Sequence, residues 1–366
     1  MQKFKYLVLL SLFAGIIMVS CTRTEREKYE RVLSFDRNVV ETREPELVCL
    51  LSEDSILIGQ IKDFTLLNDT SFVVVDGRGA YLYHISGTFI KRFGHLGRAE
   101  GEMLSPSAIY SNSNFVYIWC STLLKILIFD NEAHFKKELS GFARGVQKFV
   151  VDPNDEIVYL YTSGFCNKSG SKTIDVITTY DIAEKLIKES FGERGGEDEV
   201  LFVSQNSSGL YADMDRLIYL HPGNLIVYNL DLNSDKTTRY KIKDKAFWRE
   251  QVTDSRKVVN DRHKLFDYLF NNSVVRGFHK DGNQYIIIAD IGKFDFDEQR
   301  GFMEIQKNRK IKLYIFDSAF NPIRTILFDY FFTPNIMIYS GAMYFLSLNL
   351  DGENQKIMLN RFSLSI

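Results

Sequence analysis

Residues 128–130 read Ile-Phe-Asp at the end of a run rich in β-branched and aromatic residues. Similar phrases, an aromatic residue usually followed by Asp or Asn, recur as Thr179-Tyr180-Asp181, Val227-Tyr228-Asn229 and Ile315-Phe316-Asp317, with a weaker copy at Leu82-Tyr83-His84. The last residues of these phrases lie 46, 51, 48 and 88 residues apart, and the final interval fits two units or one enlarged unit. A repeat of about 40–50 residues with all-β patterning is typical of propeller blades of four strands each.

Dividing the chain at these phrases gives six units of short strands. They cover residues 58–93, 107–139, 147–191, 209–242, 274–328 and 336–362. The first five units contain four predicted strands each, whereas the last contains three. A strand at residues 46–51 would complete the last unit, and this closure would remove an open sheet edge. The sequence therefore predicts an all-β fold: a single six-bladed β-propeller of four-stranded antiparallel blades over residues 33–366.

The longest interruption of this pattern, residues 243–273, separates the fourth unit from the fifth. Apolar residues between Val258 and Leu269 recur near a 3.6-residue period, which predicts a helix, and Asp254 or Ser255 would cap its start. We therefore expect a helical insertion between blades 4 and 5. It would cover the channel mouth, dock a partner or pack on the ring.

The N-terminus has the features of an export signal. Lys3 and Lys5 precede an apolar run at residues 6–18 that is too short to span a bilayer comfortably. The run ends in Met18-Val19-Ser20-Cys21, which resembles the bacterial lipobox, in which the cysteine is acylated. We expect a signal peptide at residues 1–20, lipidation of Cys21, a polar tether at 21–32 and a membrane-anchored lipoprotein of the cell envelope, facing the periplasm or the surface. An ordinary signal peptide with a chance cysteine is the alternative.

Net charge and composition restrict the classes of partner that the protein is expected to bind. The chain has 45 Lys and Arg against 47 Asp and Glu, a net charge of −2, and removing residues 1–20 with their two lysines makes it about −4. A nucleic-acid partner would require a basic face, so none is expected. The 29 Phe and 19 Tyr favour strands.

Three cysteines follow Cys21, namely Cys49, Cys120 and Cys166. An odd number cannot form a complete disulfide framework, although one disulfide stays open. Cys120 lies inside an apolar run and is expected as a small core residue.

The joint after the first unit reads Phe93-Gly94-His95-Leu96-Gly97-Arg98-Ala99-Glu100-Gly101-Glu102 and ends at Pro106. It resembles the Gly-rich joint of the TolB-like six-bladed propeller lipoproteins of Bacteroides-type bacteria, relatives of the NHL-repeat propellers. Residues 55–61 are also similar. The family's Gly-Pro-Gly-Glu keeps only Gly101-Glu102 here, and a second copy at 191–197 is degenerate. The resemblance covers nearly the whole mature chain and implies a fold and a compartment, but little chemistry.

Catalytic motifs are largely absent from the sequence. The six histidines are scattered with no HExxH pair, and there is no GxSxG elbow and no P-loop. Asp231, Asn233 and Asp235 resemble the start of a calcium loop but lack its glycine and glutamate, so a polar turn is favoured. The acidic cluster Asp295, Asp297 and Glu298 would suit a cation or a solvated loop. We predict no catalytic residue, no metal and no cofactor.

The long connections gather on one side of the predicted ring. In a propeller the connections between the second and third strands (B–C) and between blades (D–A) share one face, called here the long-loop face. It would carry the connections at 94–106, 163–173, 192–208, 243–273 and 290–310. Long loops are usually functional or disordered, so this face is the predicted binding face, with drift of an unconstrained surface as the alternative.

Eight candidate ligand-binding residues follow from this geometry. Six lie at or just beyond the ends of second strands, and two lie in the first inter-blade joint. They are Asp76, Arg78, Trp119, Tyr161, His221 and Asp290, with Arg98 and Glu102 from the joint; Asn349 holds the equivalent place in the last unit. Aromatic and charged groups together suit a sugar, a glycan fragment or a peptide.

Three functions remain open on the sequence. The first, a propeller that binds a ligand or protein partner at the cell envelope without catalysis, is preferred because the chemistry-bearing motifs are missing. The second is a scaffold subunit of an envelope complex that docks through residues 243–273. The third is a metal-assisted hydrolase or lyase, for which Asp76, Asp290 and His221 are the available groups.

Overall fold

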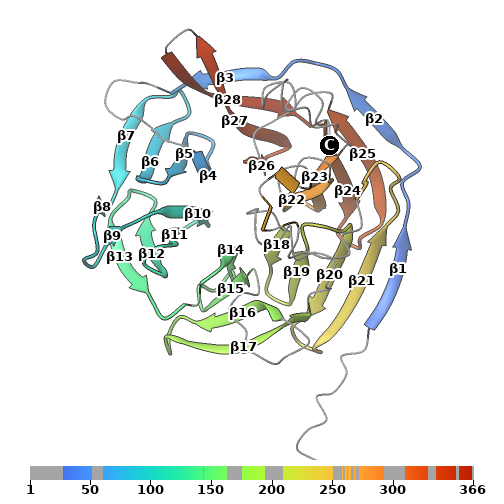
Figure 1. Cartoon of the computed structure of the whole chain (residues 1–366), viewed down its shortest axis with the longest axis horizontal. Helices are drawn as coiled ribbons and strands as arrows, with labels where there is room; N and C mark the ends of the chain where they lie inside the picture. Colours follow the sequence, from blue (N-terminus) through green and yellow to red (C-terminus); the bar gives the residue numbers. More distant parts are fainter. Residues whose placement is uncertain are drawn as a thin grey trace, which may run out of the picture.

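The computed structural model describes residues 28–51, 61–142, 144–162, 175–193, 209–249, 272–291, 310–328, 335–351 and 354–364, with a few single positions between 258 and 268. Within these ranges the chain forms six four-stranded antiparallel blades around a central axis (Figure 1). The predicted all-β six-bladed propeller is confirmed. The inner strands of the six blades contact one another in chain order, and the last contacts the first, so the ring is closed.

Each blade runs from its inner to its outer strand along the chain. Blade 1 contains β4 (Ile61–Asn68), β5 (Ser71–Asp76), β6 (Gly79–His84) and β7 (Phe89–Phe93). Blade 2 contains β10 (Pro106–Ser111), β11 (Phe115–Cys120), β12 (Lys125–Asp130) and β13 (Phe135–Leu139). Blade 3 contains β14 (Val146–Val151), β15 (Ile157–Thr162), β16 (Asp175–Asp181) and β17 (Leu186–Glu193).

The second half of the ring continues the pattern. Blade 4 contains β18 (Gly209–Ala212), β19 (Arg216–Leu220), β20 (Ile226–Asp231) and β21 (Lys236–Ile242). Blade 5 contains β22 (Val274–Asp281), β23 (Gln284–Ile291), β24 (Lys310–Asp317) and β25 (Pro322–Phe328). Blade 6 contains β26 (Ile336–Tyr339), β27 (Ala342–Asp351) and β28 (Asn354–Ser363), and its fourth strand is β3 (Glu46–Leu50).

The chain before blade 1 forms a belt on the outer rim, seen as the blue strands in Figure 1. In this belt β1 (Lys28–Leu33) pairs in parallel with β21, β2 (Asn38–Glu41) pairs in parallel with β25, and β3 pairs antiparallel with β28. Blades 4 and 5 therefore have five strands, and β3 closes blade 6. The tether expected at 21–32 is corrected, because residues 28–32 form β1 instead. Pairing of β1 covers the edge of β21 and buries Leu33.

The recurring aspartate caps the turn between the third and fourth strands of a blade. Asp317 Oδ1 accepts hydrogen bonds from the N–H groups of Ala319 (2.9 Å) and Asn321 (2.8 Å). Asp130 makes the equivalent bonds in blade 2. Short polar side chains favour such turns because they satisfy backbone donors locally.

In blade 4 the equivalent residue is Asp231, two positions after the Asn229 that the sequence pattern selected. Asp231 Oδ1 accepts from the N–H groups of Asn233 (3.0 Å) and Ser234 (2.7 Å). The three polar residues that resembled a calcium loop therefore form a capped hairpin turn, with Asp235 at a positive φ of 57°.

Several predictions fall on residues outside the described ranges. These are the signal peptide with Cys21, the acidic cluster at 295–298, Cys166, and most of the long connections. The helix predicted within 243–273 is not shown, because most of residues 250–271 lie outside those ranges. No helix among the described residues is long and apolar enough to cross a membrane.

Candidate functional site

Four of the six inner strands contain a β-bulge at the same level. The register shifts between Ile61 and Asp63, between Pro106 and Ala108, between Val146 and Lys148, and between Val275 and Gly277. Each bulge lies near the start of its strand, which is the end at the long-loop face. Bulges re-aim side chains and are common beside active sites. The long-loop end of the propeller axis is therefore the candidate site.

The side chain of Lys148 shows that charged groups from separate blades meet at this axis. Lys148 lies on β14 in blade 3, yet its Nζ donates to the backbone carbonyl of Arg276 on β22 in blade 5 (3.1 Å). Blade 4 lies between these blades, so the side chain crosses the axis region. Within the described part of the chain, this is the hydrogen bond that the ammonium makes. Two of its three N–H groups thus have no protein acceptor there.

Asp63 on β4 brings a carboxylate to the same region from blade 1. The N–H of Phe64 donates to its Oδ1 (2.9 Å), and the N–H of Ile109 in blade 2 donates to its Oδ2 (3.1 Å). Burial raises the pKa of Asp63 to about 6, although the positive charge of Lys148 and both N–H groups act in the opposite direction. Asp63 and Lys148 thus interact electrostatically, but they form no ion pair with each other among the described residues.

Blade 5 supplies an ion pair beside Lys148. Arg276, at the bulge of β22, donates through Nη2 to Asp290 Oδ2 (2.7 Å), and these side chains are only 11% and 2% exposed. A charge-assisted hydrogen bond in so buried a position is strong and well oriented. Asp290 is thereby connected to the axis through Arg276.

His279 lies farther along β22 and completes the group. Burial lowers its pKa to about 3, the charge of Lys148 lowers it further, and a hydrogen bond to the backbone of Ile336 opposes both. Its imidazole is therefore neutral at pH 7. The backbone of Gly277 lies close to both groups: a Cβ there would lie 3.1 Å from His279 Nε2, tighter than an ordinary contact, and 3.7 Å from Lys148 Nζ.

These five side chains are called the axial cluster: Asp63, Lys148, Arg276, His279 and Asp290. At neutral pH the cluster holds two cations, two anions and one neutral imidazole. Burial lowers the pKa of Lys148 and raises that of Asp63, because the charged form of each side chain is less favourable where it is desolvated. Burying an ion is unfavourable by several kcal/mol unless it is paired. Such a cluster is suited to pair with charged groups of a ligand.

Of the eight residues predicted from sequence, Asp290 belongs to the axial cluster. Asp76 caps the β5–β6 turn, accepting from the N–H groups of Arg78 (2.8 Å) and Gly79 (2.8 Å), and Arg78 is exposed. Glu102 Oε2 accepts from the N–H of Ala99 (2.8 Å) and so fixes the inter-blade joint. Arg98 is exposed on that joint.

The three predicted aromatic and histidine candidates lie inside the protein. Trp119 is 1% exposed and packs edge-on against Phe142 in the core between blades 2 and 3. Tyr161 and His221 are also buried, and Tyr161 Oη lies 2.8 Å from His221 Nδ1 across the seam of blades 3 and 4. Asn349 lies on β27. The structure thus brings Tyr161 and His221 together and places Trp119 apart from them.

The sequence analysis missed Asp63, Lys148, Arg276 and His279. Each lies on an inner strand with one apolar neighbour in the sequence, and a charged or imidazole side chain on such a strand is the signal that would have identified them. The second strands were chosen because their ends approach the long-loop face. The inner strands approach the axis more closely, since a blade widens outward from its first strand.

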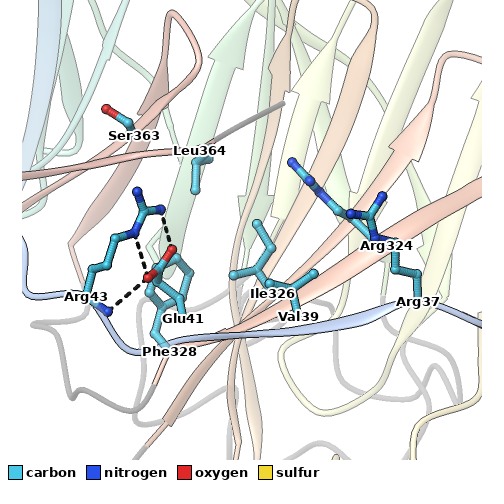
Figure 2. Close-up of a pocket in the computed structure, with 9 residues that line it drawn as sticks. All are labelled: Arg37, Val39, Glu41, Arg43, Arg324, Ile326, Phe328, Ser363 and Leu364. Carbon is cyan, nitrogen blue, oxygen red and sulfur yellow. Dashed lines mark hydrogen bonds and ion pairs between the residues drawn. The ribbon is translucent and has the colours of Figure 1, made fainter.

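A separate hollow lies on the outer rim, where the belt crosses blades 5 and 6 (Figure 2). It has a volume of about 240 Å³ and is lined by Arg37, Val39, Glu41, Arg43, Arg324, Ile326, Phe328, Ser363 and Leu364. Glu41 is paired with Arg43 through both carboxylate oxygens. Arg37 and Arg324 lie side by side in Figure 2, and burial together with the charge of Arg37 lowers the pKa of Arg324.

Two solved structures from Bacteroides are similar to this chain in fold. One, from Bacteroides fragilis NCTC 9343, bears the name "Putative exported protein"; it has a TM-score of 0.59 and 12% sequence identity, and the match covers 91% of this chain and 99% of that one. The other is a member of the DUF4221 family from Bacteroides vulgatus ATCC 8482, with a TM-score of 0.59 and 12% identity over 87% of this chain and 96% of that one. At this identity the likeness shows the fold alone.

No family model matches the chain, and no protein of curated function matches it. The relation to TolB-like and NHL-repeat propellers therefore stays a prediction. Among the residues that the structure describes, no group of three His, Cys, Asp or Glu side chains is placed to hold a metal ion.

Proposed function

We propose that this protein is an exported, lipid-anchored binding protein of the cell envelope, which holds a small polar ligand at the axial cluster on its long-loop face. The observation that carries the proposal concerns two side chains, those of Lys148 and Asp63. Both are charged groups with only partial solvent contact, both keep hydrogen-bonding capacity, and they form no ion pair with each other among the described residues. Buried charges of this kind are expensive for stability and concentrate where a protein binds a ligand.

Export is supported by two independent observations. The sequence begins with a charged segment and an apolar run that ends in Met18-Val19-Ser20-Cys21. One structural neighbour from Bacteroides bears the name of an exported protein. Acylation of Cys21 would leave a tether of residues 21–27 before the belt begins at Lys28.

The ligand is tested by a thermal-shift screen of residues 22–366 against short peptides, glycans, peptidoglycan fragments and divalent metals. A ligand at a hundred times its Kd stabilises the folded state by about 2.7 kcal/mol, which raises the melting temperature by a few degrees. We expect a shift that is lost in Lys148→Met and retained in Lys137→Met, a matched change of an exposed lysine on β13. A shift retained in Lys148→Met would place the ligand elsewhere on the protein.

The anchor is tested on the full-length chain in a Gram-negative host. We expect the wild type to sediment with membranes and its N-terminal peptide to carry acyl groups on Cys21 by mass spectrometry. Cys21→Ser is expected to be released into the soluble fraction or to keep its signal. An unmodified Cys21 in a cleaved, soluble chain would leave export intact and reject the anchor.

A further inference from the structure

The balance of charge in the axial cluster limits the ligand to one chemical class. Arg276 and Asp290 pair with each other directly (2.7 Å). Lys148 and Asp63 have opposite charge and interact through space, but no ion pair joins them within the described residues. Within the described residues the formal charges of these five side chains sum to zero, and Lys148 and Asp63 form no ion pair with each other.

We infer that the ligand is a small zwitterion of the amino-acid or short-peptide type, with its carboxylate on Lys148 and its ammonium on Asp63. The inference rests on the proposed binding function and names its ligand class. A neutral site with separated charges favours a ligand that is neutral overall but carries both charges, because each end then replaces lost solvation with an ion pair. A net anion or a net cation would leave one buried charge of the cluster unmatched.

Lys148 keeps hydrogen-bond donors that a carboxylate could accept. Its Nζ donates once, to the carbonyl of Arg276, and has two more N–H groups to offer. The backbone of Gly277 lies close to Nζ and to the neutral imidazole of His279, since a Cβ there would lie 3.7 Å and 3.1 Å from them. Both Lys148 and His279 keep partial contact with solvent.

Asp63 is equally suited to an ammonium. Each of its carboxylate oxygens accepts one backbone N–H and keeps a second lone pair. The two N–H groups come from adjacent blades and fix the orientation of the carboxylate. Asp63 keeps partial contact with solvent, so a ligand can reach it.

The experiment combines ligand analogues with protein variants in a thermodynamic cycle, measured by isothermal titration calorimetry on residues 22–366. The probes are alanyl-alanine, its C-terminal amide, its N-acetyl form and the uncharged disaccharide cellobiose. We expect alanyl-alanine to bind, and the amide and the N-acetyl form each to bind at least tenfold more weakly. The affinity of Lys148→Met for alanyl-alanine should fall to the affinity of the wild type for the amide. Its affinity for the amide should be no lower than that of the wild type. Asp63→Asn should show the same relation with the N-acetyl form.

Lys137→Met and Asp36→Asn, which change exposed residues, serve as controls and should leave all affinities unchanged. If the amide and N-acetyl forms bind as well as the free dipeptide, or if none of the peptides binds, the zwitterion inference is overturned. If cellobiose binds and Lys148→Met abolishes that binding, the axial site stands and only its ligand class is wrong.

Discussion

Asp63 is the residue whose burial is most clearly unfavourable for the stability of the fold. Its carboxylate is satisfied by two backbone N–H groups, yet burial still raises its pKa to about 6. An asparagine would have nearly the same shape and no charge, although its amide nitrogen could not accept the second N–H. An aspartate at this position is understandable if the charge serves a ligand, because the charge does not serve the stability of the fold.

We predict that Asp63→Asn becomes more favourable relative to wild type as the pH rises from about 4 to 7. The folded-state pKa lies above the ordinary value of 3.8, so the folded protein binds this proton more tightly than the unfolded chain does. Stability from this group therefore declines as pH rises from about 4 to 6. The amide nitrogen of the variant cannot accept one of the two N–H groups, a loss that is the same at both pH values. Allowing for the partial solvent contact of Asp63, we expect the free energy of unfolding of the variant, relative to wild type, to be about 1–2 kcal/mol higher at pH 7 than at pH 4. Urea unfolding at both pH values measures this difference, and a relative stability that does not rise with pH would show that attraction to Lys148 dominates.

Asp317 represents the opposite kind of residue, one that serves the fold alone. Its carboxylate accepts from the N–H groups of Ala319 and Asn321 and from Asn321 Nδ2. We predict that Asp317→Ala lowers the free energy of unfolding by about 1–3 kcal/mol, since several turn donors lose their acceptor. The matched control is Ser318→Ala on the exposed tip of the same turn, expected within about 0.5 kcal/mol of wild type. Equal effects of the two changes would argue against the cap.

At the scale of elements, the belt is the feature that distinguishes this propeller. Its three strands lie on three successive blades, and their roles differ. Strand β3 is the fourth strand of blade 6, whereas β1 and β2 are fifth strands on complete blades. Closure of the ring therefore depends on β3, and β1 and β2 reinforce edges that already exist. Pairing of β1 also fixes where the proposed anchor meets the ring, at the rim of blade 4.

Stepwise truncation separates these roles. Chains that start at residue 34 lack β1, those that start at 42 also lack β2, and those that start at 52 lack all three. We expect modest losses of melting temperature in the first two steps, and in the third a far larger drop or loss of the cooperative transition, because blade 6 loses its outer strand. Differential scanning calorimetry measures this. Equal drops at every step would contradict the closing role of β3.

At the scale of the whole molecule, six blades pack through apolar layers that run between neighbouring sheets. Blades 1 and 2, for example, share a layer that contains Val73, Phe93, Ile118 and Cys120. Cys49 lies in the layer between blades 6 and 1. Both thiols are buried, and burial raises the pKa of Cys49 to about 11 and that of Cys120 to about 12. The reactivity of these thiols would therefore report on opening of the ring.

We predict that neither thiol reacts with a thiol-specific reagent in the native state. Thiolate is the reactive form, and at pH 8 its fraction at a pKa of about 11 is about one in a thousand. In residues 22–366 carrying Cys166→Ser, labelling should therefore be at least about a hundredfold slower without denaturant than in 6 M guanidinium. Fast native labelling of Cys49 alone would show that the seam between blades 6 and 1 opens separately.

The number and order of the blades were determined by the sequence itself, because each blade is a local structure. The aspartate of the repeat caps a turn that lies within a few residues of it, and alternating apolar residues set the neighbouring strands, so both leave a signal in one stretch of chain. Only the tertiary structure decided the outer strands β1 and β2 of the belt and the axial cluster. Strands β1 and β2 pair with partners about two hundred to three hundred residues away and leave exposed side chains, so they lack an apolar pattern. Asp63, Lys148 and Arg276 come from blades 1, 3 and 5, and they meet because closure of the ring brings the inner strands to one axis.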